Sequence, residues 1–141
     1  MAIRNIRTEE DEVLRKRCRE ITEMTPKLAT LIDDMLETMY EANGVGLAAP
    51  QVGILKRVVV IDVGDGPYIL INPVILETDG SQTGGEGCLS LPGKTATVTR
   101  PNYVKVREKL LDTRQTLCDI IAGNAAAVEG SHRELCTRLT N

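Results

Sequence analysis

The chain is poor in histidine and in aromatic residues. Among its 141 residues there are one histidine, three tyrosines, and no tryptophan or phenylalanine. A single histidine excludes a metal site built from several imidazoles of one chain, and three aromatic rings offer few surfaces for stacking single-stranded bases. The pI is near 5.2, whereas a duplex nucleic-acid binder usually has a high pI and a basic stripe. We therefore expect no specific nucleic-acid partner and a core made of aliphatic side chains.

Long apolar runs are also missing. The longest contain four residues, as at 58–61, whereas a membrane span needs about 20. The first ten residues carry charge and lack the apolar segment of a signal peptide. We therefore expect a cytoplasmic protein with no membrane partner. The four cysteines form no C-x-x-C pair, so reduced thiols, buried or bound to metal, are expected rather than disulfides.

The length fits one domain, which we expect to span residues 1–141. An amphipathic helix is predicted over 26–42, because Thr25 and Pro26 form a start signal and Asn43-Gly44 forms a stop. A shorter helix, capped by the T-x-x-D pattern at 8–11, is predicted over 9–19. The apolar residues at helical spacing in the first of these helices, of which Leu31 and Met35 are expected in the core, are Leu28, Leu31, Ile32, Met35, Leu36 and Met39.

Strand patterns follow the first helix. Residues 57–63 are β-branched and end in a turn cluster, and residues 68–76 form a second candidate that Asn72-Pro73 interrupts. Residues 95–99 and 103–107 alternate, with a turn between them. Strands that do not alternate with helices favour an α+β fold, with antiparallel strands packed on an amphipathic helix.

Two glycine-rich stretches carry the residues with chemical potential. Residues 44–51 read GVGLAAPQ, which lacks the third glycine and the lysine of phosphate-binding loops. This stretch is either a tight connection with a surface glutamine or a place where another backbone approaches closely. Residues 84–92 read GGEGCLSLP, and their cysteine is either a buried small residue or a thiolate that attacks a carbonyl or holds a metal.

Taken together, the two stretches resemble the first two of three motifs of the peptide deformylase family. GVGLAAPQ at 44–51 matches one motif and EGCLS at 86–90 matches the other, in the expected order and separation. The resemblance runs over residues 1–111, and residues 112–141 form a divergent tail. It implies a deformylase-like fold with an altered C-terminal part, and an enzyme that hydrolyses the N-formyl group of formyl-methionyl nascent peptides near the ribosome.

The resemblance also implies roles for individual residues. Cys88 would be a ligand of a divalent metal, iron(II) or its substitutes nickel, cobalt or zinc, whose bound hydroxide attacks the formyl carbon. The Gln51 side chain and the Leu89 N–H would donate to the formyl oxygen. Gly46 would hydrogen-bond the substrate backbone, and Val45 would help to wall the methionine pocket.

The third motif of the family, H-E-x-x-H, is absent from this chain. On a helix its two histidines share one face and reach one ion. The nearest pattern here is His132 with Cys136, either a nitrogen–sulfur pair that joins Cys88 at the metal or part of a poorly ordered tail. Two short helices are predicted in the tail, at 124–129 and at 131–139.

Three hypotheses about function follow. The chain is a deformylase-type metallohydrolase, or a catalytically inactive or impaired relative whose last helix has been replaced, or a module that binds formyl-methionyl peptides without chemistry. Because the resemblance ends abruptly, we expect a reading-frame change in the gene after about codon 109. A shifted frame that encodes H-E-x-x-H would support this explanation, and its absence from every frame would refute it.

Overall fold

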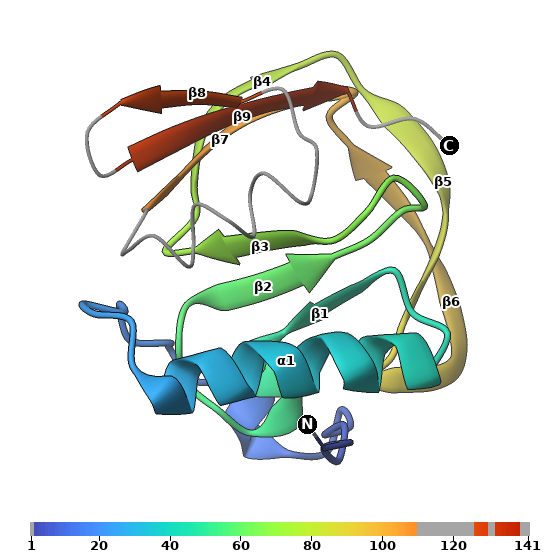
Figure 1. The fold of residues 1–141 in the computed structure, drawn as a ribbon. Coiled ribbons are helices and arrows are strands. Elements are labelled where there is room, and N and C mark those ends of the chain that lie inside the picture. Colours follow the sequence, from blue (N-terminus) through green and yellow to red (C-terminus); the bar gives the residue numbers. More distant parts are fainter. Residues whose placement is uncertain (1, 110–125, 130–131, 139–141) are drawn as a thin grey trace.

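The structure is a computed structural model that describes residues 2–109, 126–129 and 132–138 (Figure 1). All pairings between its strands are antiparallel, which together with the helix confirms the expected α+β fold. The sheets have the strand orders β1-β2-β3, β4-β7-β9-β8 and β5-β6. In chain order the elements are η1 (Glu12–Arg15), α1 (Pro26–Glu41), β1 (Gly46–Ala48), η2 (Ala49–Val52), β2 (Val58–Ile61), β3 (Tyr68–Ile71), β4 (Val74–Asp79), β5 (Gln82–Cys88), β6 (Leu91–Arg100), β7 (Tyr103–Lys109), β8 (Ala126–Glu129) and β9 (His132–Arg138).

Helix α1 begins and ends where the sequence predicts. The Thr25 hydroxyl accepts a hydrogen bond from the Leu28 N–H at 3.1 Å, and Pro26 occupies the first turn, where no amide donor is needed. At the other end Asn43 adopts a left-handed conformation with φ 57°, and the Gly44 N–H donates to the Met39 carbonyl at 2.9 Å. No helix in the described part of the chain is long and apolar enough to cross a membrane.

The apolar face of α1 packs on the β1-β2-β3 sheet and forms the core (Figure 1). Leu31 and Met35 are 4% and 0% exposed, which confirms both as core residues. In β2 the side chains alternate, with Val58 and Val60 buried. The buried apolar residues of this cluster are Ile21, Leu28, Leu31, Ile32, Met35, Met39, Leu47, Ala49, Val52, Val58, Val60, Ile69 and Ile71.

Asn72 separates two strands, as the interrupted pattern at 68–76 indicates. Its φ of 50° turns the chain out of the β1-β2-β3 sheet, so that β3 and β4 belong to different sheets. The buried Asn72 side chain accepts from the Ile21 N–H at 2.8 Å and donates to the Ile21 carbonyl at 2.7 Å. These two bonds fix the segment before α1 to the end of β3.

The prediction of a helix over 9–19 is wrong, because only the single turn η1 forms there. Asp11 caps this turn by accepting from the Val13 N–H at 3.0 Å, but the segment buries no residue that could stabilise a longer helix. Beyond η1 the chain is extended, and Arg19 forms an isolated parallel bridge with Lys56.

The helices predicted in the tail are also wrong, since residues 126–129 and 132–138 form β8 and β9. Residues 124–125, 131 and 139 of those predictions lie outside the described residues. Tertiary pairing explains the difference, because β9 pairs with β7 from Tyr103 opposite Arg138 to Lys109 opposite His132. Pairing with an existing strand outweighs weak local helix preference.

Candidate active site

Gln51 is held in one orientation by the turn on which it lies. Its Oε1 accepts from the Ala48 N–H at 3.0 Å, so its Nε2 faces the opposite way. Nε2 donates to Ser90 Oγ at 3.0 Å and lies 3.7 Å from Cys88 Sγ. The backbone beneath is fixed as well, because the Gln51 carbonyl accepts from the Arg7 N–H at 2.7 Å. The structure thus brings Gln51 and Cys88 together, from positions 37 residues apart in the sequence.

Cys88 ends β5, and Leu89 and Ser90 form the turn into β6. Cys88 is exposed, whereas Ser90 is only 4% exposed. Ser90 is a site residue for which sequence analysis assigned no role, although it lies within the matched EGCLS motif. Its side chain supports Gln51, and its carbonyl accepts from the Glu9 N–H at 3.1 Å.

The two glycine-rich stretches touch where Gly44 meets Leu89. A Cβ built on Gly44 would lie 2.6 Å from Leu89 Cδ1, which is closer than two carbon atoms can approach without a shift. Gly44 therefore permits the Leu89 side chain to pack down toward the core cluster. This contact places the Leu89 turn beside the start of β1.

β1 is an edge strand of its sheet, paired through Gly46 opposite Ile61. Val45, just before the strand, is 63% exposed. A Cβ on Gly46 would lie 3.9 Å from the Val60 carbonyl oxygen, so the fold itself leaves room for a side chain there. An edge strand can pair with an added extended peptide.

The start of β1 is anchored to α1 by a tyrosine and an aspartate. The Tyr40 hydroxyl donates to Asp62 Oδ2 at 2.6 Å, and the Asp62 N–H donates to the Val45 carbonyl at 2.9 Å. Burial and the hydrogen bond to Asp62 raise the pKa of Tyr40 to about 12. The same hydrogen bond holds the pKa of Asp62 below its usual range. The tyrosine is therefore neutral and available as a donor at physiological pH.

A cavity of about 340 Å³ adjoins Gln51 and Cys88. Glu9, Leu14 and Arg15 from the N-terminal segment line it together with these two residues. Sequence analysis did not identify these three, because nothing in their spacing connects them with residues more than 30 positions away. Glu9 also forms an ion pair with Lys94 of β6, so the N-terminal segment and the β5-β6 hairpin close the site from two sides.

The β5-β6 hairpin is reinforced by an ion pair across it. Arg100 Nε donates to Glu86 Oε1 at 2.7 Å, and Arg100 Nη2 donates to Glu86 Oε2 at 2.8 Å. The hydrogen bond from Arg100 holds the pKa of Glu86 below its usual range. The pair and the backbone ladder join β5 to β6, and Cys88 is the last residue of β5.

The described residues alone do not make up a complete metal centre. Within the ranges that the structure describes, no group of three or more histidine, cysteine, aspartate or glutamate side chains could hold an ion, whereas catalytic metal sites use three protein ligands. His132 lies in β9 opposite Lys109, and its side chain is outside what the structure describes. Along a strand, residues four apart are separated by about 13 Å rather than the roughly 6 Å of a helix, so the helical premise for pairing His132 with Cys136 is wrong.

Comparison with known proteins identifies relatives of this chain. The family model for polypeptide deformylase matches residues 3–132. A peptide deformylase of Agathobacter rectalis is 76% identical over 107 residues, which are 76% of this chain and 68% of that protein. Peptide deformylase 1 of Clostridium perfringens is 47% identical over 137 residues, covering 96% of this chain and 93% of that protein. The crystal structure of the Thermotoga maritima peptide deformylase superposes with a TM-score of 0.80 at 39% identity, covering 96% and 82% of the two chains.

Proposed function

Because the chain belongs to the peptide deformylase family, a family of metal-dependent hydrolases, we propose that its site binds the N-formyl group of formyl-methionyl peptides for hydrolysis. The observation that carries the proposal is the orientation of Gln51. The Ala48 N–H occupies Oε1, so the amide presents its donor side toward Cys88. A fixed donor beside a thiol suits a carbonyl oxygen that gains charge during hydrolysis.

Gln51 and the Leu89 N–H are the two donors that we assign to the formyl oxygen. Donors of this kind are typically worth about 2.7–4 kcal/mol each in the transition state. Both belong to rigid parts of the molecule: Gln51 is tied by three hydrogen bonds, and Leu89 is packed against Gly44. Little reorganisation is needed when the oxygen becomes negative.

We place the peptide along the open edge of β1. Its backbone would pair with Gly46 as an added strand, and the exposed Val45 side chain would contact the methionine side chain. Because the fold has room for a Cβ at Gly46, packing does not require a glycine at this position. This supports a role for Gly46 in binding a ligand. The Gly46→Ala substitution should therefore weaken peptide binding and leave the thermal midpoint unchanged.

We propose iron(II), with nickel, cobalt or zinc as substitutes, as the ion of this site, and Cys88 as its ligand. One thiolate among the described residues is fewer than the three ligands of a catalytic site, so the ion should be held weakly. His132 stays a prediction as a second ligand, and metal analysis of His132→Ala tests it. The natural substrates on this proposal are nascent chains near the ribosome in the cytoplasm.

A second function is favoured by the absence of H-E-x-x-H from the chain. Without that motif the formyl-recognition residues remain, but the two histidine ligands and the general base do not. The 141-residue chain would then bind formyl-methionyl peptides with little or no turnover.

A binding titration separates formyl recognition from catalysis. Formyl-Met-Ala-Ser should bind more tightly than Met-Ala-Ser by up to about tenfold, the value of one net hydrogen bond. Gln51→Ala should remove the preference, while Gln82→Ala, the same change at the start of β5, should retain it. Release of formate in the same samples reports turnover. Equal binding of both peptides by the unmodified chain would contradict the proposal.

A further inference from the structure

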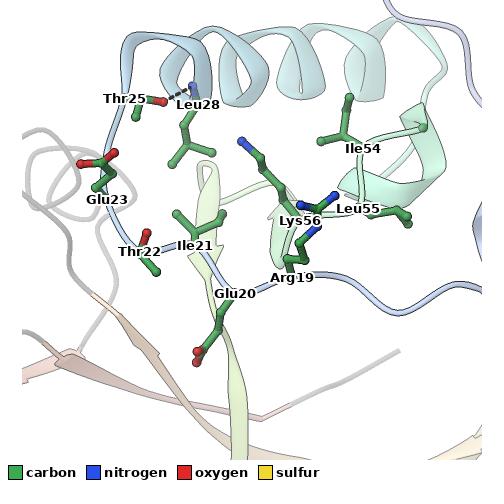
Figure 2. A pocket seen from close by; sticks show the side chains of 11 residues that line it. Arg19, Glu20, Ile21, Thr22, Glu23, Thr25, Leu28, Ile54, Leu55 and Lys56 are labelled. Carbon is green, nitrogen blue, oxygen red and sulfur yellow. Dashed lines mark hydrogen bonds between the residues drawn. The ribbon is translucent and has the colours of Figure 1, made fainter.

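A second cavity, of about 500 Å³, lies between the segment before α1 and the loop after η2 (Figure 2). This volume lies within the range of small-molecule sites, about 300–1,000 Å³. Neither Gln51 nor Cys88 lines it. Its walls combine the buried side chains of Ile21 and Leu28 with the half-buried Ile54.

Two cations are brought side by side in this cavity by the backbone. The Arg19 N–H donates to the Leu55 carbonyl at 2.9 Å, and the Arg57 N–H donates to the Arg19 carbonyl at 3.0 Å. Arg19 and Lys56 are therefore bridge partners on adjacent parallel segments. In Figure 2 the Lys56 ammonium points toward the first turn of α1, between Leu28 and Ile54, and the Arg19 guanidinium lies beside Lys56.

These cations have no ion-pair partner within the part of the chain that the structure describes. Neither Arg19 nor Lys56 takes part in an ion pair or a side-chain hydrogen bond there. Glu20 and Glu23 also line the cavity, but their carboxylates point away from Lys56 in Figure 2. Like charges held close together repel, and an anion placed between them would relieve that repulsion.

We propose that this cavity binds a small carboxylate that carries an aliphatic group. The carboxylate would be held by Arg19 and Lys56 through charge-assisted hydrogen bonds. The aliphatic group would cover Ile21, Leu28 and Ile54, where contact with apolar surface removes water. Both a free short-chain acid and the C-terminus of a peptide that ends in leucine have this chemistry.

Titrations followed by amide chemical shifts test the ligand class on the chain as it is. Hexanoate and N-acetyl-leucine should shift the amides of residues 19–21 and 54–56 with a Kd of about 1 mM, a value within reach of ligands of this size. Acetate, which lacks the aliphatic group, and hexan-1-ol, which lacks the charge, should bind at least about tenfold more weakly. Tighter binding of N-acetyl-leucine points to a peptide C-terminus, and tighter binding of hexanoate points to a free acid.

A pair of double variants tests the site itself. Arg19→Gln with Lys56→Gln should weaken hexanoate binding at least about tenfold, as expected when charge-assisted hydrogen bonds are removed. Lys16→Gln with Arg17→Gln makes the same change in net charge outside the cavity and should leave the Kd within about twofold. The proposal is overturned if acetate or hexan-1-ol binds as tightly as hexanoate, or if the two double variants behave alike.

Discussion

The bond between Ser90 and Gln51 gives a direct test of how the site is held. The Ser90→Ala substitution removes the oxygen that accepts from Gln51 Nε2 at 3.0 Å, at a residue only 4% exposed. One such hydrogen bond contributes about 0.5–1.5 kcal/mol net to stability. Gln51→Ala removes the same bond together with the one from Ala48. The two substitutions should therefore overlap rather than add.

A double-mutant cycle on the free energy of unfolding in urea measures this overlap. We expect a coupling energy of about 0.5–1.5 kcal/mol between Ser90→Ala and Gln51→Ala. Ser90→Ala with Asp34→Asn is the control pair, because Asp34 contacts Ala2 and Arg4 instead, and it should add within about 0.5 kcal/mol. Ser90→Thr keeps a hydroxyl and should retain most of the coupling. Additivity of Ser90→Ala and Gln51→Ala would refute the claim that Ser90 orients Gln51.

Three further predictions concern the core, an ion pair and the metal. Leu31→Ala should lower the free energy of unfolding by about 2–5 kcal/mol, and Leu36→Ala, the same change at a half-buried position of α1, by clearly less; a urea series in which both lose the same amount would contradict the packing. Burial raises the pKa of Asp34, but hydrogen bonds from Ala2 and Arg4 outweigh burial and hold that pKa below its usual value. The stability that this group contributes is therefore complete above the unfolded pKa of about 3.9 and is lost as the pH falls through the lower folded value. Asp34→Asn should therefore reduce the fall of the urea midpoint between pH 5 and pH 3. Dialysed protein should hold less than one metal ion per chain; one tightly held ion that both His132→Ala and Cys136→Ala release would show that the tail supplies ligands.

Local signals in the sequence predict the parts of the fold that local interactions determine. The limits of α1 follow from Thr25, Pro26 and Gly44, and the break at Asn72 follows from its proline neighbour. The strands β1 and β5 were missed because glycine-rich segments have no side-chain pattern, and they form by backbone pairing with β2 and β6. The prediction of helices in the tail was wrong because strand pairing with β7 outweighed the local preference for helix.

Some residues of the site were predicted from the sequence, and others were found only in the structure. Gln51 and Cys88 were identified by motif resemblance, and the structure brings them within 3.7 Å. Ser90 lies within the EGCLS motif, but its contact with Gln51 was not predicted. Glu9 and Arg15 belong to no motif, and they reach the site through long-range contacts. Whether Arg19 and Lys56 share a cavity could not be read from the sequence, because it depends on a bridge between segments 37 positions apart.

We propose that Gln51 and the Leu89 N–H of this chain bind the formyl oxygen, and that a chain whose sequence contains no H-E-x-x-H activates water poorly. General-base loss alone typically lowers rates by about 10²–10⁴-fold, and effects of residues that act together are not additive. The most direct test is hydrolysis of formyl-Met-Ala-Ser by the purified chain and by a version to which an H-E-x-x-H helix has been added. We expect activity at or near background for the chain itself and recovery in the extended version, abolished there by Gln51→Ala or Cys88→Ala. Robust turnover by the unmodified chain that Cys88→Ala does not affect would contradict the account.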